Sequence, residues 1–257
     1  MLDRKQKYLQ IAFNRTLEEI AAMINSLPLS NRIIIEAGYP LIKTYGIESI
    51  RKIRQWWSER VLGYSIESPS MEFKGLSDFL IKSLFKKSTS ESIKKEIAFS
   101  PYIIADLKCM DRAFAEVEAA ASAGASAATC LGLAPLETID EFIKRCEELG
   151  IDSILDMINI EYPFEVLSNL IKPPTIVMLH RGVDEEENRG KEIPYQEIER
   201  IKSVYEDVLI AVAGGETINE VITGAFNDAD IIVVWRLFNE NPEKIVVITN
   251  EFLKEIK

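Results

Sequence analysis

Short runs of β-branched and other apolar residues alternate with longer amphipathic segments along almost the whole chain. We predict eight strands, each followed by a segment with apolar residues at helical spacing. Runs that are apolar throughout, such as Ile231-Ile232-Val233-Val234, are typical of parallel strands covered on both faces. The predicted strands are residues 8–13, 32–37, 102–107, 127–131, 153–157, 175–179, 209–213 and 231–234, and the predicted helices are residues 17–25, 47–59, 112–123, 138–149, 164–170, 195–205, 217–226 and 242–254.

Eight strand–helix units in this order predict a (β/α)8 barrel that forms a single domain over residues 1–257. Barrels of this kind commonly need about 250 residues, which agrees with the length of the chain. The alternative is an open, doubly wound parallel sheet. No Gly-x-Gly-x-x-Gly turn follows a predicted strand to support that alternative.

One stretch between the second helix and the third strand interrupts the alternation. Residues 56–100 are far longer than the connections of about 2–6 residues that are usual in such folds. We predict an insertion here, with an additional amphipathic helix over residues 76–87. Because it follows a helix and precedes a strand, the insertion is expected at the bottom of the barrel, away from the chemistry.

Composition restricts the partners that we expect. The net charge of −11 argues against a nucleic-acid partner, because a phosphate backbone requires basic patches. Cys109, Cys130 and Cys146 form no Cys-x-x-Cys pair, as expected for a protein of the reducing cytoplasm. No apolar run is long enough to span a bilayer and the N-terminus has no signal-peptide pattern, so no membrane partner is expected.

Polar residues follow nearly every predicted strand at its C-terminal end, where barrel enzymes carry their active sites. Taken singly, an Asp there often caps a helix, a lone His is often structural, and an Arg can be a surface charge. Their gathering at one rim favours a catalytic site instead. The residues concerned are Asn14, Glu36, Asp106, Lys108, Asp111, Asp156, Asn159, His180, Arg181, Gly214, Gly215 and Arg236.

The segment Asp106-Leu107-Lys108-Cys109-Met110-Asp111 is the strongest catalytic candidate. Positions 106 and 108 of a strand point to the same face, so both side chains are expected in the barrel mouth. A lysine between carboxylates keeps its charge and can stabilise negative charge on a substrate oxygen. Glu36 and Asp106, on adjacent strands, offer the hard oxygen ligands that Mg²⁺ prefers.

A phosphate site is predicted near the last two strands. Gly214 and Gly215 precede the seventh helix and Arg236 precedes the eighth. The corresponding loops of barrel enzymes often bind phosphate through backbone N–H groups and helix N-termini. A plain turn is an equally good explanation of the two glycines alone.

Several of these segments together resemble the orotidine 5′-monophosphate decarboxylase suprafamily, and within it the archaeal type of 3-hexulose-6-phosphate synthase. The resemblance covers the chain outside residues 56–100. The segments that carry it are Ile-Glu-Ala-Gly-Tyr-Pro-Leu-Ile-Lys at 35–43, Ile-Ala-Asp-Leu-Lys-Cys-Met-Asp at 104–111, Gly-Leu-Ala-Pro-Leu-Glu-Thr-Ile at 132–139, Leu-His-Arg-Gly-Val-Asp at 179–184 and Ala-Val-Ala-Gly-Gly at 211–215.

The resemblance implies an aldehyde-lyase that uses Mg²⁺ to join formaldehyde to ribulose 5-phosphate, or that catalyses the reverse reaction. Glu36 and Asp106 would bind the metal, Lys108 would stabilise the enediolate, and His180 would transfer the proton at C1. Asp111 would reach the partner's site in a homodimer with shared active sites. Gly214, Gly215 and Arg236 would bind the phosphate.

Three positions depart from the pattern of the family that the chain resembles. Asn14 stands where Asp is usual, Trp235 where Gly is usual, and Tyr39 where Thr is usual. Asn14 and Trp235 are expected to line the substrate and phosphate site. The departures keep two alternatives open. One is decarboxylation of a 3-keto sugar-phosphate acid or of orotidine monophosphate, and the other is a divergent paralogue with weak or no catalysis.

Overall fold

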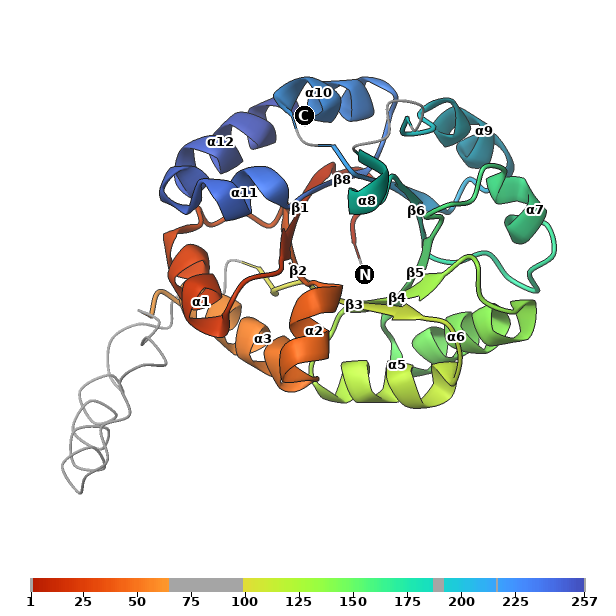
Figure 1. Ribbon diagram of the computed structural model, residues 1–257, viewed down its shortest axis with the longest axis horizontal. Helices are drawn as coiled ribbons and strands as arrows, with labels where there is room; N and C mark the ends of the chain where they lie inside the picture. The colour runs from red at the N-terminus through yellow and green to blue at the C-terminus, as the bar shows by residue number, and fades with distance from the viewer. Residues whose placement is uncertain (1, 65–98, 187–191, 216, 257) are drawn as a thin grey trace.

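The computed structural model describes residues 2–64, 99–186, 192–215 and 217–256. Eight parallel strands close into a barrel in chain order, with β1 paired to both β2 and β8 (Figure 1). The predicted (β/α)8 barrel is therefore confirmed, and the alternative of an open sheet is wrong. The strands are β1 (Tyr8–Phe13), β2 (Ile33–Ala37), β3 (Ile103–Cys109), β4 (Ala127–Leu131), β5 (Asp152–Asp156), β6 (Ile176–His180), β7 (Leu209–Ala213) and β8 (Ile231–Val234).

Helices form a ring around the barrel (Figure 1). Three short helices, α2, α8 and α11, follow strands and were not predicted. Within the described residues, no helix is both long and apolar enough to cross a membrane. The helices are α1 (Leu17–Ser26), α2 (Tyr39–Tyr45), α3 (Glu48–Val61), α5 (Ala113–Ser122), α6 (Leu136–Leu149), α7 (Pro163–Leu167), α8 (Val183–Glu186), α9 (Gln196–Val204), α10 (Ile218–Phe226), α11 (Arg236–Glu240), the 3₁₀ helix Pro242–Lys244 and α12 (Ile245–Glu255).

Helices α1 and α10 both begin with a capping box. The side chain of Thr16 accepts the N–H of Glu19, and the Glu19 carboxylate accepts the N–H of Thr16. Thr217 and Glu220 form the same reciprocal pair at the start of α10. Each pair satisfies backbone groups that a helix terminus would otherwise leave without partners, so the strand-to-helix turn takes a defined path.

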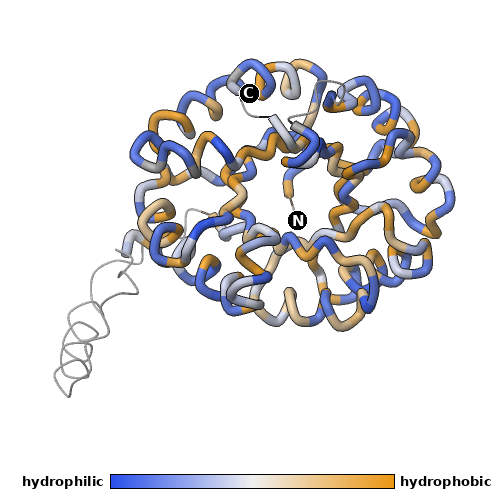
Figure 2. The backbone as a smooth tube through the Cα atoms, in the orientation of Figure 1, coloured by the Kyte–Doolittle hydropathy of each residue, from blue (hydrophilic) through white to orange (hydrophobic). Residues whose placement is uncertain are grey.

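The core has two layers because successive side chains of a strand point to opposite faces. Hydrophobic residues predominate along the central ring of strands (Figure 2). Residues such as Leu9 and Ile11 pack outward against the helices, whereas Tyr8 and Ala12 point into the barrel. The interior carries the rings of Tyr8 and the partly buried Tyr102 at the bottom. At the carboxyl ends of the strands, small residues such as Ala12 and Ala213 leave space beside the partly buried Trp235.

Residues 65–98 lie outside the described residues, and with them most of the predicted insertion at 56–100 and the predicted helix at 76–87. The first residues of the predicted insertion, 56–61, belong to the barrel, because α3 continues to Val61. Trp56 and Trp57 are buried in the core, and the Trp57 ring centre lies 6.0 Å from that of Phe99. The predicted helix over residues 47–59 therefore ends two residues before α3 does.

Candidate functional site

A cavity of ≈490 Å³ opens at the carboxyl ends of the strands. It brings together most of the residues that were predicted from the sequence, whereas Asp111, Asp156, Asn159, Gly215 and Arg236 are not among its lining residues. The cavity is lined by Ala12, Asn14, Glu36, Tyr39, Pro40, Asp106, Lys108, Ile158, Met178, His180, Arg181, Gly182, Val183, Asp184, Ala213, Gly214, Val233 and Trp235.

Asp156 connects the basic groups of the site. Lys108 Nζ donates to Asp156 Oδ2 at 3.0 Å, and His180 Nδ1 lies 2.9 Å from both carboxylate oxygens of Asp156. The sequence placed Asp156 at the rim but assigned it no role, and it predicted Asp111 as a neighbour of Lys108. The structure gives Lys108 two partners, Asp156 and Asp106, the latter at 3.4 Å.

Asp106 is oriented from two sides. Thr129 Oγ1 donates to Asp106 Oδ1 at 2.8 Å, and the backbone N–H of Tyr39 donates to Asp106 Oδ2 at 3.2 Å. Thr129 Oγ1 also accepts the backbone N–H of Lys108 at 3.0 Å. Thr129 was missed in the sequence, where the only available signal was a polar residue in the middle of the apolar run 127–131.

The path of β3 at Lys108 is irregular. The register between β3 and β4 shifts between Ala105 and Cys109, and Lys108 has a φ of 46°. This φ belongs to the left-handed region, which a side chain with a Cβ rarely adopts. The regular strand geometry used in the prediction is therefore wrong at Lys108, although its side chain still lines the cavity beside Asp106. Such irregular backbone concentrates at functional sites.

Charge in the site is set by burial and by close opposite charges. Burial by itself would raise the pKa of Asp156, but the charges and hydrogen bonds of His180 and Lys108 outweigh it and lower that pKa to about 2. Burial lowers the pKa of Lys108, but the Asp106 and Asp156 carboxylates outweigh it and raise that pKa above its ordinary value. At neutral pH the site therefore holds an ammonium group and an ionised carboxylate in contact.

The pKa of Glu36 shifts in the opposite direction to that of Asp156. Burial and the nearby Asp106 charge raise the pKa of Glu36 to about 8, while a hydrogen bond from Gln10 Nε2 opposes that rise. Gln10 is fully buried inside the barrel and was missed in the sequence, because one polar residue in an apolar run carries no signal of its neighbours. A cation beside Glu36 and Asp106 would relieve the repulsion between their carboxylates.

The donor set fits Mg²⁺, which usually takes one or two carboxylates and retains several waters. Glu36 and Asp106 supply the carboxylates. Within the described residues no cluster of three or more Asp, Glu, His or Cys side chains is arranged for a metal, so a fully protein-ligated site is not present there. Asn14 Oδ1 is a further oxygen on this wall, and it is buried without a hydrogen-bond partner among the described residues.

Gly38 is required by this packing. A Cβ on Gly38 would stand 1.9 Å from Asn14 Oδ1, so any larger residue would displace the Asn14 side chain. Gly38 immediately precedes α2.

Asp111 lies outside the cavity of its own chain. It is exposed, and its Oδ1 accepts the N–H of Arg112 at 2.7 Å. The prediction that Asp111 belongs to the same cluster as Lys108 is therefore wrong for one chain. Its predicted place in a partner's site concerns a second chain and stays a prediction.

The residues predicted to bind phosphate are separated in the structure. Gly214, with a φ of 95°, lines the cavity, as does Trp235. The Arg236 guanidinium stacks over the Trp235 ring, 5.3 Å from its centre. Gly215 and Arg236 thus lie next to the cavity but do not contribute to its described wall.

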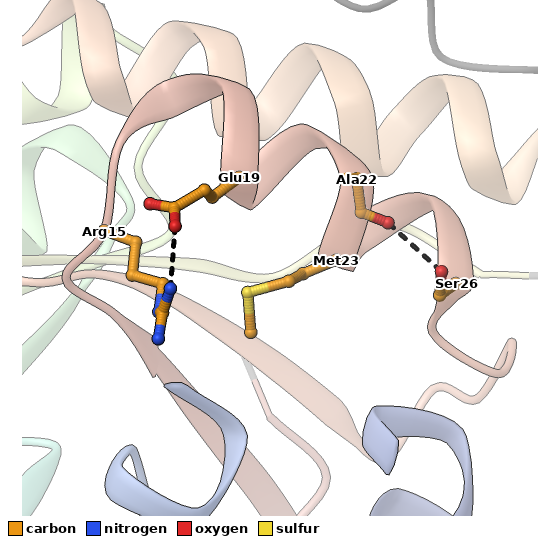
Figure 3. Close-up of a pocket in the computed structure, with 5 residues that line it drawn as sticks. All are labelled: Arg15, Glu19, Ala22, Met23 and Ser26. Carbon is orange, nitrogen blue, oxygen red and sulfur yellow. Dashed lines mark hydrogen bonds and ion pairs between the residues drawn. The ribbon is translucent and has the colours of Figure 1, made fainter. Parts of the chain in front are cut away.

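A second hollow of ≈260 Å³ lies along α1 (Figure 3). Arg15 Nη1 donates to Glu19 Oε1 at 2.7 Å, and Ser26 Oγ donates to the Ala22 carbonyl at 3.2 Å. It contains none of the predicted site residues, and these polar groups already bind one another. The cavity at the barrel mouth is therefore the candidate active site.

Comparison with known proteins agrees with this architecture. Residues 80–244 match the family model described as Orotidine 5′-phosphate decarboxylase / HUMPS family. The chain belongs to this family. The resemblance found in the sequence segments is thereby confirmed.

Two curated relatives of this family member are named Bifunctional enzyme Fae/Hps. The protein of Methanothrix thermoacetophila is 33% identical over 251 residues, covering 97% of this chain and 53% of the relative. That of Methanocella arvoryzae is 34% identical over 253 residues, covering 97% of this chain and 53% of the relative. The chain thus spans about half the length of the curated relatives that it matches.

Solved structures share the fold. The 3-hexulose-6-phosphate synthase of Salmonella typhimurium has a TM-score of 0.70 and 20% identity, covering 97% of this chain and 98% of that one. KGPDC of Streptococcus mutans has a TM-score of 0.63 and 17% identity, covering 98% of this chain and 97% of that one. At these identities the likeness supports the barrel, and the chemistry has to be argued from the site.

Proposed function

We propose that this protein is a lyase of the aldolase type, which joins formaldehyde to ribulose 5-phosphate or cleaves hexulose 6-phosphate. Membership of the family supports an aldolase or decarboxylase activity, and the names of the Fae/Hps relatives favour the aldolase. The observation that carries the proposal is the contact of the buried Asp156 with both Lys108 and His180, which line one cavity. A charged lysine can stabilise an enolate oxygen, and an oriented histidine can transfer the proton.

His180 is the proposed proton carrier. The carboxylate of Asp156 is ionised, so it accepts a hydrogen bond from Nδ1–H, which leaves Nε2 as the basic atom. Nε2 removes a proton from C1 of ribulose 5-phosphate and later returns a proton to the product oxygen. Histidine suits both steps because its ordinary pKa lies close to neutral pH.

Lys108 is the proposed stabiliser of the enediolate. Its ammonium group is held between Asp106 and Asp156, so it is ordered before substrate binds. After C1 loses its proton, negative charge develops on the substrate oxygen, and a fixed positive charge stabilises it. The C1 carbon then attacks formaldehyde, the new C–C bond forms, and the former carbonyl oxygen of formaldehyde accepts a proton.

Glu36 and Asp106 would hold Mg²⁺, and Asn14 Oδ1 lies on the same wall of the cavity. When bound, Mg²⁺ would supply a Lewis acid that polarises substrate oxygens. The phosphate of the substrate would bind near Gly214, whose positive φ lets the backbone approach a ligand closely.

A homodimer with shared active sites is part of the proposal. Asp111 is exposed and lies within three residues of two exposed apolar side chains, Met110 at 47% and Phe114 at 49% exposure. A second copy that covered this surface would bury both apolar groups and would bring Asp111 to the partner's cavity.

The deciding experiment measures formaldehyde released from hexulose 6-phosphate, with and without Mg²⁺. Release that requires Mg²⁺ supports the proposal. Release of CO₂ from a 3-keto sugar-phosphate acid or from orotidine monophosphate, without formaldehyde release, would assign the other chemistry. A divergent paralogue would catalyse none of these reactions, and ribulose 5-phosphate with Mg²⁺ would then leave the melting temperature unchanged.

A further inference from the structure

Arg181 links the loop after β6 to the loop after β7. Its Nη2 donates to the carbonyl oxygen of Gly214 at 2.6 Å and to Glu220 Oε1 at 3.1 Å. The backbone N–H of Arg181 also donates to the carbonyl oxygen of Ala213 at 3.1 Å. The side chain is only 16% exposed, and the residue lines the cavity at the barrel mouth.

Gly214 fits tightly against Arg181. A Cβ on Gly214 would stand 2.3 Å from the Arg181 carbonyl oxygen, and the φ of 95° is one that residues with a side chain rarely adopt. The Gly214 backbone therefore packs against Arg181 in a way that leaves no room for a side chain. Because N–H and C=O of a trans peptide point in opposite directions, fixing the Gly214 carbonyl also fixes the direction of the Gly215 N–H.

Glu220 extends the link to helix α10. Its Oε1 accepts from Arg181, while its Oε2 accepts the backbone N–H of Thr217 at 3.0 Å. One carboxylate thus holds both the start of α10 and the guanidinium that binds Gly214. The Arg181–Glu220 ion pair thus connects the Gly214 carbonyl to the first residue of the α10 capping box.

Arg181 also brings a guanidinium group, paired with Glu220, to the wall of the cavity. Of the arginines in the described ranges, it is the one among the cavity-lining residues, whereas Arg236 stacks on Trp235 beside the cavity. Lys108 is paired with Asp106 and Asp156. The Nε of Arg181 is buried and has no hydrogen-bond partner in the described part of the chain.

We propose that Arg181 is the positioning residue of the phosphate subsite, which it shapes by binding the Gly214 carbonyl and Glu220 together. The inference rests on the proposed function, in which a phosphorylated sugar occupies the cavity. Backbone N–H groups bind phosphate only when they are held in a convergent arrangement. Arg181 supplies that order between β7 and α10.

The test compares Arg181→Ala and Arg181→Lys with the unaltered protein by calorimetric titration. The ligands are inorganic phosphate, ribulose 5-phosphate and unphosphorylated ribulose. Loss of charged hydrogen bonds is expected to weaken binding of both phosphate ligands by about tenfold or more in Arg181→Ala. Binding of ribulose should not change, and turnover should show a raised KM with kcat within about threefold. Arg181→Lys keeps the charge and is expected to restore part of the affinity.

Arg54 offers a matched control. Its Nη1 binds the Pro101 carbonyl at 2.8 Å and Ser126 Oγ at 3.3 Å, near the opposite end of the barrel. Arg54→Ala should lower the melting temperature and leave phosphate binding unchanged. If Arg181→Ala does not fold, Arg181→Lys is compared with the unaltered protein, and its affinity for both phosphate ligands should be lower, because lysine lacks the planar guanidinium.

A double-mutant cycle separates positioning from direct contact. Glu220→Gln keeps the size of the side chain but weakens its bond to Arg181, so phosphate affinity should fall by about threefold or more. Adding Arg181→Ala should then cost less than it does alone. Fully additive effects, or normal phosphate affinity in Arg181→Ala, would overturn the inference. If the unaltered protein binds neither phosphate ligand, the proposed function itself fails and the inference fails with it.

Discussion

Lys108 Nζ lies 3.0 Å from Asp156 Oδ2, although the two residues are 48 positions apart and belong to β3 and β5. The same carboxylate binds His180 of β6. Three strands that do not all neighbour one another in the sheet thus contribute to one charged unit. The predictions below concern this unit and the residues around it.

Asp156→Asn should lower turnover on the order of a thousandfold, because the amide removes the negative charge that orients Lys108 and His180. Asn159→Gly is the control, since Asn159 is exposed in the loop that follows Asp156 and has a φ of 58° that glycine adopts readily. Rates are measured with hexulose 6-phosphate. Equal rates in both variants would remove Asp156 from the mechanism.

Lys108→Ala should abolish measurable turnover while the protein remains folded, because the side chain projects into the cavity. Loss of one preorganised positive charge beside a developing oxyanion commonly costs about a hundredfold to a thousandfold in rate. Circular dichroism and the melting temperature check the fold. Normal rates in this variant would show that the enediolate is stabilised by another group.

The titration of Glu36 should make the free energy of unfolding depend on pH. Its pKa of about 8 lies above the ordinary value, so the folded state binds more protons than the unfolded state between about pH 4.5 and 8. Its contribution to the free energy of unfolding is therefore fully present below this window and is lost as pH rises through it. Glu36→Gln should abolish this loss, which denaturant titrations at several pH values measure.

The rise in melting temperature caused by Mg²⁺ provides a second test of Glu36. Protons compete with the metal for this carboxylate, so Mg²⁺ should raise the melting temperature more at pH 8.5 than at pH 6. Glu36→Gln should lose most of this increase. An unchanged response in the variant would exclude Glu36 as a ligand.

Trp235→Gly should tighten the binding of inorganic phosphate. The change removes a ring that lines the cavity and releases the Arg236 guanidinium that stacks on it. Trp235→Phe keeps an aromatic ring and should bind phosphate like the unaltered protein. Weaker binding in Trp235→Gly would show instead that the ring is part of the phosphate site.

Mixing Asp111→Ala with Lys108→Ala tests the proposed shared site. Each variant alone should be inactive. Heterodimers would contain one site with both residues intact, so mixing after reversible dissociation should restore up to about a quarter of the normal activity. Sedimentation confirms the dimer. A mixture that stays inactive while dimers exchange would contradict a role for Asp111 across the interface.

The sequence by itself determined the barrel. Short apolar runs and amphipathic segments at helical spacing are local patterns, and eight such pairs in order leave few ways to bury every strand on both faces. The same pattern located the carboxyl ends of the strands, and with them Glu36, Asp106, Lys108 and His180. Their gathering required only that the strands be parallel and closed, which the topology confirms.

Only the tertiary structure decided which side chains touch. The pairing of Lys108 with Asp156 depends on the closure of the barrel and on the irregular backbone of β3, neither of which a local period encodes. Gln10 and Thr129 are single polar residues in apolar runs, so their contacts with Glu36 and Asp106 become visible only across strands. The tertiary structure also leaves Asp111 outside the cavity of its own chain and stacks Arg236 on Trp235. The sequence does not show either result, because residues close in sequence can face different surroundings.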